Sequence, residues 1–83
     1  MKPKLRIYQR DGCHLCEVAY EQLRDLQAEY PFELEQIDIE ASDELHRRYL
    51  ARIPVIALGG EELYDFSIDL ADLKSRLLAA SAR

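Results

Sequence analysis

The segment from Pro54 to Gly60 constrains the fold of this chain more than any other part of the sequence. A proline can open a β-strand but not sit inside one, because it lacks the N–H that the strand ladder needs. Pro54 is followed by the apolar run Val55-Ile56-Ala57-Leu58 and then by Gly59-Gly60, a pair typical of a two-residue hairpin turn. The segment therefore predicts a buried strand over 55–58 that turns back into an antiparallel strand over 62–66.

Alternating strand and helix patterns precede this hairpin. Strand-favouring residues alternate over 4–8 and stop before the turn-forming Asp11-Gly12. A helix is predicted from about Cys13 until Pro31 closes it, because apolar residues recur there at three- and four-residue steps. This stripe consists of Cys16, Ala19, Tyr20, Leu23, Leu26 and Tyr30.

The remaining segments predict one more strand and two helices. A second strand is predicted over 32–39, where the alternation slips at Glu35-Gln36 and indicates a bulge or a later start. Ser42 caps a short helix over 43–50, and Asp69 caps a final helix. The inward-facing residues of these two helices are Leu45, Tyr49, Leu70, Leu73, Leu77 and Ala80.

The resulting order, β-α-β-α-β-β-α, predicts a single α/β domain over residues 1–83. A chain of 83 residues has room for only one hydrophobic core. A right-handed crossover makes the first two strands parallel, whereas the hairpin makes the last two antiparallel. We therefore expect a mixed four-stranded sheet with helices on both faces.

Charge and composition limit the classes of function. The net charge is -5, and the basic residues are interleaved with more numerous acids, which argues against a nucleic-acid partner. No apolar run reaches membrane-spanning length, and the first strand begins too early to leave room for a secretory signal. We expect a cytoplasmic monomer without a membrane partner, in a compartment that keeps thiols reduced.

The motif Cys13-His14-Leu15-Cys16 holds both cysteines of the chain and admits three interpretations. A structural disulfide over so short a loop removes less unfolded-state entropy than the roughly 3 kcal/mol assigned to a 15-residue loop. A metal site is the second interpretation, but the motif supplies only two of the four ligands that a closed zinc site takes. Zinc or an iron-sulfur cluster would then be shared across a dimer.

A redox-active dithiol is the third interpretation, and it fits the expected local geometry best. A sulfur at the helix N-terminus lies near unsatisfied N–H groups and the positive end of the helix dipole, which lower the thiol pKa. Cys13 is then the nucleophile. Cys16 lies one turn later on the same face, within reach of a mixed disulfide at Cys13, and its place on the apolar stripe predicts the lower exposure.

Several segments, taken in chain order, resemble those of the glutaredoxins, and most closely the small glutaredoxin-like proteins that carry Cys-His-Leu-Cys. The resemblance covers nearly the whole chain. Its segments are Ile7-Tyr8, Cys13-His14-Leu15-Cys16, Gln36-Ile37-Asp38-Ile39, and Arg52-Ile53-Pro54-Val55-Ile56 with the Gly59-Gly60 hairpin.

This resemblance implies a thioredoxin-like fold of the glutaredoxin type, with sheet order 2-1-3-4. It also implies a cis peptide bond between Ile53 and Pro54 beside the dithiol. In such proteins the backbone before the cis proline pairs with an extended substrate, which makes Ile53 and Pro54 substrate-contacting positions.

The chain departs from the glutathione-binding members of that family in two places. Those members carry Gly-Gly-x-Asp ahead of the last helix and Cys-Pro-Tyr-Cys as the dithiol, whereas this chain has Phe66-Ser67-Ile68-Asp69 and Cys-His-Leu-Cys. Asp69 can still receive the glutathione amine, and nearby N–H groups its carboxylate. The missing glycines leave glutathione binding open.

Other side chains near the dithiol each have a functional and a structural interpretation. A protonated His14 would stabilise the thiolate, or it is an exposed first-turn histidine of little influence. Leu15 contacts substrate or is a solitary exposed leucine. Tyr8 is a catalytic phenol or a substrate contact, or it is a core or edge aromatic, and packing is the commoner role. Arg10 and Arg52 attract the carboxylates of glutathione or remain solvated.

We therefore expect a thiol-disulfide oxidoreductase in which Cys13 attacks and Cys16 resolves, acting on protein disulfides or glutathione-mixed disulfides. This chemistry needs no organic cofactor and no metal, with glutathione as a possible co-substrate. The alternative is a binding or carrier module without turnover, which holds a metal or an iron-sulfur cluster through Cys13 at a dimer interface.

Overall fold

The chain alternates strands and helices in the order that its sequence predicts. The computed structural model describes residues 2–81. Its elements are β1 (Lys4–Gln9), α1 (His14–Glu29), β2 (Glu33–Asp38), the 3-10 helix η1 (Ile39–Ala41), α2 (Asp43–Tyr49), β3 (Val55–Leu58), β4 (Glu61–Asp65) and α3 (Leu70–Ser81). Among these residues, none of the helices has both the length and the apolar character needed to cross a membrane.

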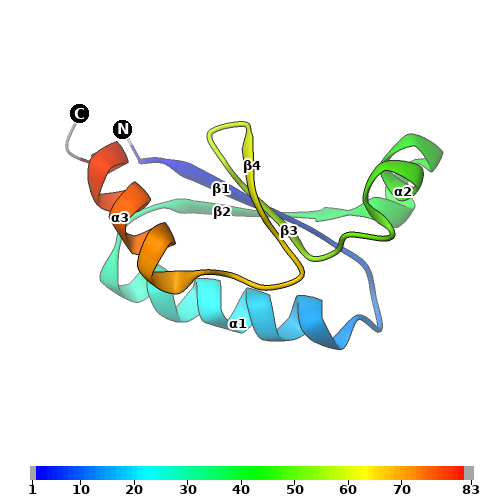
Figure 1. Ribbon diagram of the computed structural model, residues 1–83, viewed down its shortest axis with the longest axis horizontal. Coiled ribbons are helices and arrows are strands. Elements are labelled where there is room, and N and C mark those ends of the chain that lie inside the picture. Colours follow the sequence, from blue (N-terminus) through cyan, green and yellow to red (C-terminus); the bar gives the residue numbers. More distant parts are fainter. Residues whose placement is uncertain (1, 82–83) are drawn as a thin grey trace.

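The strands form one mixed sheet in the order β2-β1-β3-β4, which confirms the predicted order 2-1-3-4. β1 pairs with β2 in parallel and with β3 antiparallel, and the hairpin makes β3 and β4 antiparallel. Both hairpin glycines have positive φ, +59° at Gly59 and +90° at Gly60, the combination that a tight two-residue turn requires. Figure 1 shows α1 running along the sheet, with α2 and α3 at opposite ends of the view.

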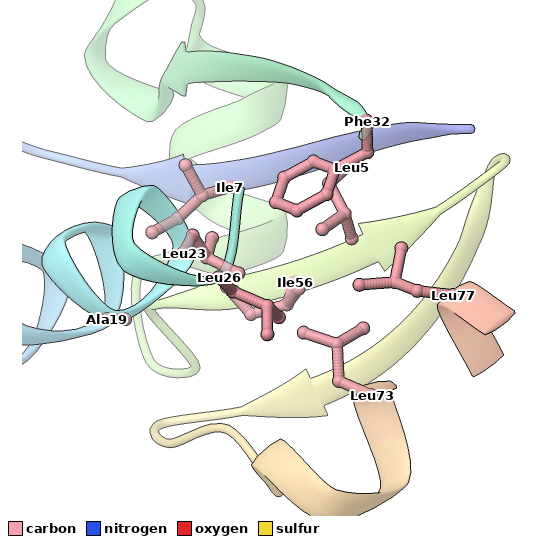
Figure 2. Close-up of a cluster of buried hydrophobic side chains, with 9 residues drawn as sticks. All are labelled: Leu5, Ile7, Ala19, Leu23, Leu26, Phe32, Ile56, Leu73 and Leu77. Atoms are coloured by element: carbon pink, nitrogen blue, oxygen red, sulfur yellow. The ribbon is translucent and has the colours of Figure 1, made fainter. Parts of the chain in front are cut away.

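The larger part of the core lies between the sheet and the pair of helices α1 and α3. Figure 2 shows its side chains converging from the strands on one side and from both helices on the other. Because α1 and α3 bury their stripes in the same cluster, they cover the same face of the sheet. The cluster consists of Leu5, Ile7, Ala19, Leu23, Leu26, Phe32, Ile56, Leu73 and Leu77.

A smaller core covers the other face of the sheet, under α2. Ile39, Tyr49 and Val55 are buried there, with Tyr8, Leu45 and Ile53 packed around them. Side chains alternate between the two faces of a strand, so Ile7 of β1 enters the larger core while its neighbour Tyr8 enters the smaller one. The prediction of helices on both faces is confirmed.

The capping residues predicted for α2 and α3 act as expected. The Ser42 Oγ accepts the N–H of Leu45 at 3.1 Å, and the Asp69 Oδ1 accepts the N–H of Asp72 at the same distance. α2 ends at Tyr49, one residue before the predicted end.

β2 differs from its predicted form. It begins at Glu33, so the later start, one of the two predicted alternatives, is confirmed. Its pairing with β1 runs unbroken from Lys4↔Glu33 to Gln9↔Asp38, without the bulge that was the other alternative. Gln36 pairs with buried Ile7 but lines an open cleft beside α1 rather than the core. A polar residue is therefore accommodated there, and the alternation of the sequence slips. The sheet's irregularity lies instead between β3 and β4, at Ile56/Ala57.

The ends of two predicted strands are also corrected. Ile39 opens η1 instead of ending β2, because the Asp38 carboxylate accepts the N–H of Glu40 at 2.9 Å and turns the chain. β4 covers Glu61–Asp65, so Phe66 lies outside the strand in which the sequence pattern placed it. Its φ of +69° is incompatible with a strand.

Candidate active site

Cys13 lies at the end of the loop that joins β1 to α1 and is the N-cap residue of the helix. Its backbone is extended, and its carbonyl accepts the N–H of Glu17 at 3.1 Å, the first hydrogen bond of α1. The N–H of Cys16 points at the Cys13 Sγ across 3.2 Å. The sulfur thus occupies the position that a serine or aspartate oxygen takes in an ordinary N-cap.

Cys13 and Cys16 are joined by a disulfide, and their Cα atoms lie 5.2 Å apart. The two residues differ in exposure. Cys13 is partly exposed, whereas Cys16 is only 2% exposed, as its place on the apolar stripe of α1 predicts. An external molecule therefore reaches the Cys13 sulfur more easily than the Cys16 sulfur.

The peptide bond between Ile53 and Pro54 is cis, as the resemblance implies, and it lies immediately before β3. Val55, the next residue, pairs with Tyr8 near the end of β1 and with Asp65 at the end of β4. The cis bond therefore lies at the end of the sheet from which the β1–α1 loop leads to Cys13. Pro54 is fully buried, and Ile53 packs against the smaller core.

Tyr8 packs in the structure, which is the commoner of its two roles. Its ring stacks on that of Tyr49, with 4.1 Å between the centroids and 18° between the planes. The guanidinium groups of Arg48 and Arg52 each lie 5.5 Å from the centroid of the Tyr49 ring, within cation–π range. Burial, together with a hydrogen bond donated to Glu62 at 2.9 Å, raises the pKa of Tyr49.

The two arginines considered for glutathione already have acidic partners. Arg52 donates to both carboxylate oxygens of Asp65 at 3.1 Å and to the Glu62 Oε1 at 2.6 Å. These contacts raise the pKa of Arg52 further, chiefly through Asp65, and the arginine in turn lowers the pKa of Glu62. The Arg10 Nε lies 3.3 Å from the Glu40 Oε1.

The remaining predicted residues lie at separate positions, two of them next to Cys13 in sequence and the third before α3. The His14 side chain is 86% exposed, and its Nδ1 lies 4.0 Å from the Glu17 Oε2. Leu15 is also exposed, in the first turn of α1. Asp69 has its Oδ1 engaged in the cap of α3, so one of its carboxylate oxygens already serves the fold.

A cleft of about 370 Å³ opens beside the disulfide. Its walls come from the β1–α1 loop, the first turns of α1 and the edge strand β2, and they include Cys16, Glu17, Tyr20, Glu21 and Gln36. The sequence analysis did not predict this cleft. The available signal was the break in alternation at Gln36, which lies where the face of the sheet that carries the larger core becomes open to solvent.

Phe66 was likewise not considered as a site residue. The structure places it directly after β4, with a side chain that is 52% exposed. The available signal was the departure from the Gly-Gly-x-Asp motif. It puts an aromatic residue where the glutathione-binding glutaredoxins have a glycine.

Residues 2–81 contain no group of three or more His, Cys, Asp or Glu side chains arranged to hold a metal ion. Among the described residues of one chain, the two cysteines therefore have no third His, Cys, Asp or Glu side chain arranged to complete a metal site with them. A site shared between two copies stays a prediction.

Comparison with known proteins agrees with the fold described above. An uncharacterized protein of Mycobacterium tuberculosis is 30% identical over 87 residues, spanning 99% of this chain and 86% of that protein. The solution structure of a protein from Nitrosomonas europaea is 37% identical and covers 92% of both chains, with a TM-score of 0.80. The thioredoxin of Fasciola hepatica, only 19% identical, shares the fold over 94% of this chain and 80% of its own, with a TM-score of 0.61.

A family model, Glutaredoxin-like domain (DUF836), matches residues 4–78, which include both cysteines and the cis proline. The chain therefore belongs to the glutaredoxin-like domain family (DUF836) and has a thioredoxin-like α/β fold.

Proposed function

We propose that this protein is a thiol-disulfide oxidoreductase that uses the Cys13–Cys16 pair. The observation that carries the proposal is the asymmetry of the pair: one sulfur is partly exposed at the start of a helix, and its partner is buried one turn later. The N–H that points at the Cys13 sulfur would stabilise a thiolate there once the disulfide is reduced.

The proposed reaction transfers two electrons from the reduced chain to a substrate disulfide. The Cys13 thiolate attacks one substrate sulfur, a mixed disulfide forms, and the other substrate sulfur leaves as a thiolate that takes up a proton. Cys16 then loses its proton and attacks the Cys13 sulfur. This releases the second substrate thiol and leaves the Cys13–Cys16 disulfide, which an external thiol reduces again.

The backbone before Pro54 supplies a way to orient the substrate in this proposal. The backbone at Ile53 lies at the end of the sheet nearest the β1–α1 loop, where an extended peptide can pair with it as an added strand. Such pairing would hold a substrate disulfide near Cys13 without requiring a particular side chain. The proposed substrates are disulfide-containing proteins or glutathione-mixed disulfides.

A trapping experiment tests the proposal. A Cys16→Ser chain should accumulate a mixed disulfide through Cys13 when mixed with an oxidised substrate, because no second thiol resolves it. A Cys13→Ser chain, equally short of one cysteine, should trap nothing because Cys16 is buried. Mass spectrometry of acid-quenched mixtures measures the amount of mixed disulfide that each variant forms. Equal trapping by the two variants would contradict the assignment of roles.

A redox titration of the wild-type pair in glutathione buffers provides an independent test. A potential in the range of the glutaredoxins, about -200 to -230 mV, would support disulfide reduction in a reducing compartment. A far more positive potential would indicate an oxidant. Stoichiometric iron or zinc in the purified protein would instead favour a carrier that holds metal through Cys13.

A further inference from the structure

Phe66 combines a backbone conformation that favours glycine with an exposed aromatic ring. Its φ is +69°, a region that disfavours any residue with a β-carbon. The conformation is held by its N–H, which donates to the Pro54 carbonyl at 2.8 Å and to the Arg52 carbonyl at 3.3 Å. The next N–H, of Ser67, donates back to the Asp65 carbonyl at 2.7 Å. This turn would form more easily with glycine, so the turn itself does not account for the aromatic ring.

The hydrogen bond to Pro54 places Phe66 at the same end of the sheet as the disulfide. Pro54 precedes β3, and Phe66 follows the last residue of β4, the strand that pairs with β3. The segment after Phe66 then crosses to the face that carries α1, because Ile68 packs into the core shared by α1 and α3. Figure 1 shows this connection running from β4 to α3 on the α1 side of the sheet.

The start of α1 contributes exposed apolar side chains of its own. Leu15 is 52% exposed and Val18 40% exposed, and their spacing of three places them on one face of the helix. Both lie within one turn of the disulfide in sequence. Three of the five large apolar side chains exposed in the described residues, Leu15, Val18 and Phe66, therefore belong to the helix start and to the turn beside the cis proline.

The charges around the disulfide are poorly suited to a small anionic thiol such as glutathione. The two cations considered for glutathione, Arg10 and Arg52, already pair with Glu40, Glu62 and Asp65. The exposed Asp11 and Glu17 flank the cysteines in sequence and would repel the carboxylates of the tripeptide. An apolar side chain of a larger substrate needs no free cation and is not repelled by these carboxylates. By packing on the exposed Phe66 ring, it also removes that ring from water.

We propose that Phe66 is a specificity-determining residue that selects polypeptide disulfides with an apolar side chain beside the reacting cysteine. This inference rests on the proposed function and narrows its substrate class. The substrate pairs as an extended segment near Ile53, its cysteine faces Cys13, and the neighbouring apolar side chain packs on the Phe66 ring. The electrons and protons move as in the reaction above, so the reduced chain ends as the Cys13–Cys16 disulfide.

Single-turnover reduction of three probes by the pre-reduced protein tests the proposal. The first probe is a short peptide dimer joined by one disulfide, with leucine next to each cysteine. The second is the same dimer with serine in place of leucine, and the third is oxidised glutathione. The rate at which the chain is oxidised is followed by acid quenching, alkylation of free thiols and mass spectrometry.

The variants separate the ring from the backbone conformation. Phe66→Ala removes the ring and keeps the unfavourable φ, whereas Phe66→Gly removes both the ring and the strain. Each should lower the rate with the leucine peptide about tenfold and change the other two rates by less than about twofold, because only the leucine contact is lost. Leu78→Ala removes an equally exposed apolar side chain from α3 and should leave all three rates unchanged.

The outcomes distinguish this inference from the function on which it rests. If the wild-type chain reduces none of the probes, the proposed oxidoreductase activity and the role of Phe66 are both wrong. If it reduces them but the Phe66 variants retain the leucine-peptide rate, or lose all three rates equally, only the role in specificity is wrong. A selective loss shared by both Phe66 variants supports it.

Discussion

The backbone N–H of Cys16 donates a hydrogen bond to the Sγ of Cys13 across 3.2 Å, at the first turn of α1. Because the donor belongs to the backbone, it remains in a variant that lacks the Cys16 thiol. The sulfur that caps the helix is therefore in a setting that favours negative charge, independent of its disulfide partner.

This geometry predicts a reactive thiolate in the reduced protein. In a Cys16→Ser chain, we expect the Cys13 thiol to titrate below free cysteine, whose pKa is about 8.5. The rate of alkylation by iodoacetamide as a function of pH measures the midpoint. The Cys13→Ser chain is the matched control, and its buried Cys16 should react more slowly. A Cys13 midpoint at or above that of free cysteine would contradict the proposed nucleophile.

Two neighbouring leucines of α3 are predicted to contribute very differently to stability. Leu77 is fully buried in the larger core, whereas Leu78 is 56% exposed. Leu77→Ala should lower the free energy of unfolding by about 2 to 5 kcal/mol, through lost burial and the cavity left behind. Leu78→Ala should change it by less than about 0.5 kcal/mol. Urea denaturation measures both, and similar values for the two variants would refute the packing described for α3.

The N-cap of α2 makes a second prediction about stability. Ser42 accepts the N–H of Leu45, so Ser42→Ala should cost about 1 kcal/mol of unfolding free energy. The same change at Ser75, an exposed position within α3, should cost nothing or stabilise slightly, because alanine has the higher helix propensity. Thermal denaturation of the two variants and the wild type measures these differences in stability. A Ser75→Ala chain as unstable as Ser42→Ala would show that capping is not the cause.

Glu62 predicts a pH-dependent part of the stability. Hydrogen bonds from Arg52 and Tyr49 hold the pKa of this carboxyl below its ordinary value of 4.5. A carboxyl whose pKa is lowered by folding adds stability above its unfolded pKa, and the contribution is lost as pH falls through the folded pKa. Glu62→Gln should therefore cost about 0.5 to 1 kcal/mol at pH 7, in the range of solvent-screened pairs. The difference from wild type should shrink below about pH 4.5.

Urea denaturation at pH 7, 5 and 3 measures that difference. Glu33→Gln removes an exposed carboxylate from β2 and serves as the control, with little effect at any of these pH values. A Glu62→Gln chain whose deficit stays constant from pH 7 to 3 would mean that the carboxylate contacts do not stabilise the fold.

Much of the fold could be read from the sequence, because its signals are local. The stripe of α1, the caps at Ser42 and Asp69, and the Gly59-Gly60 turn each depend on residues only a few positions apart. The same holds for the placement of Cys13 at a helix start and of Cys16 on the buried side. Strand ends were less certain, since Ile39 and Phe66 continue the strand pattern but leave the strands through side-chain and backbone hydrogen bonds.

The sequence by itself determined the order of the elements, the parallel pairing of the first two strands, the antiparallel pairing of the last two, and the chemistry available in the two cysteines. Only the tertiary structure decided what surrounds the disulfide. Arg52 meets Glu62 and Asp65 because the β3–β4 hairpin folds back beside it, 10 to 13 residues along the chain. Phe66 takes its positive φ because its N–H bonds to the carbonyls of Pro54 and Arg52. These contacts join residues distant in sequence, and no local preference of either partner specifies them.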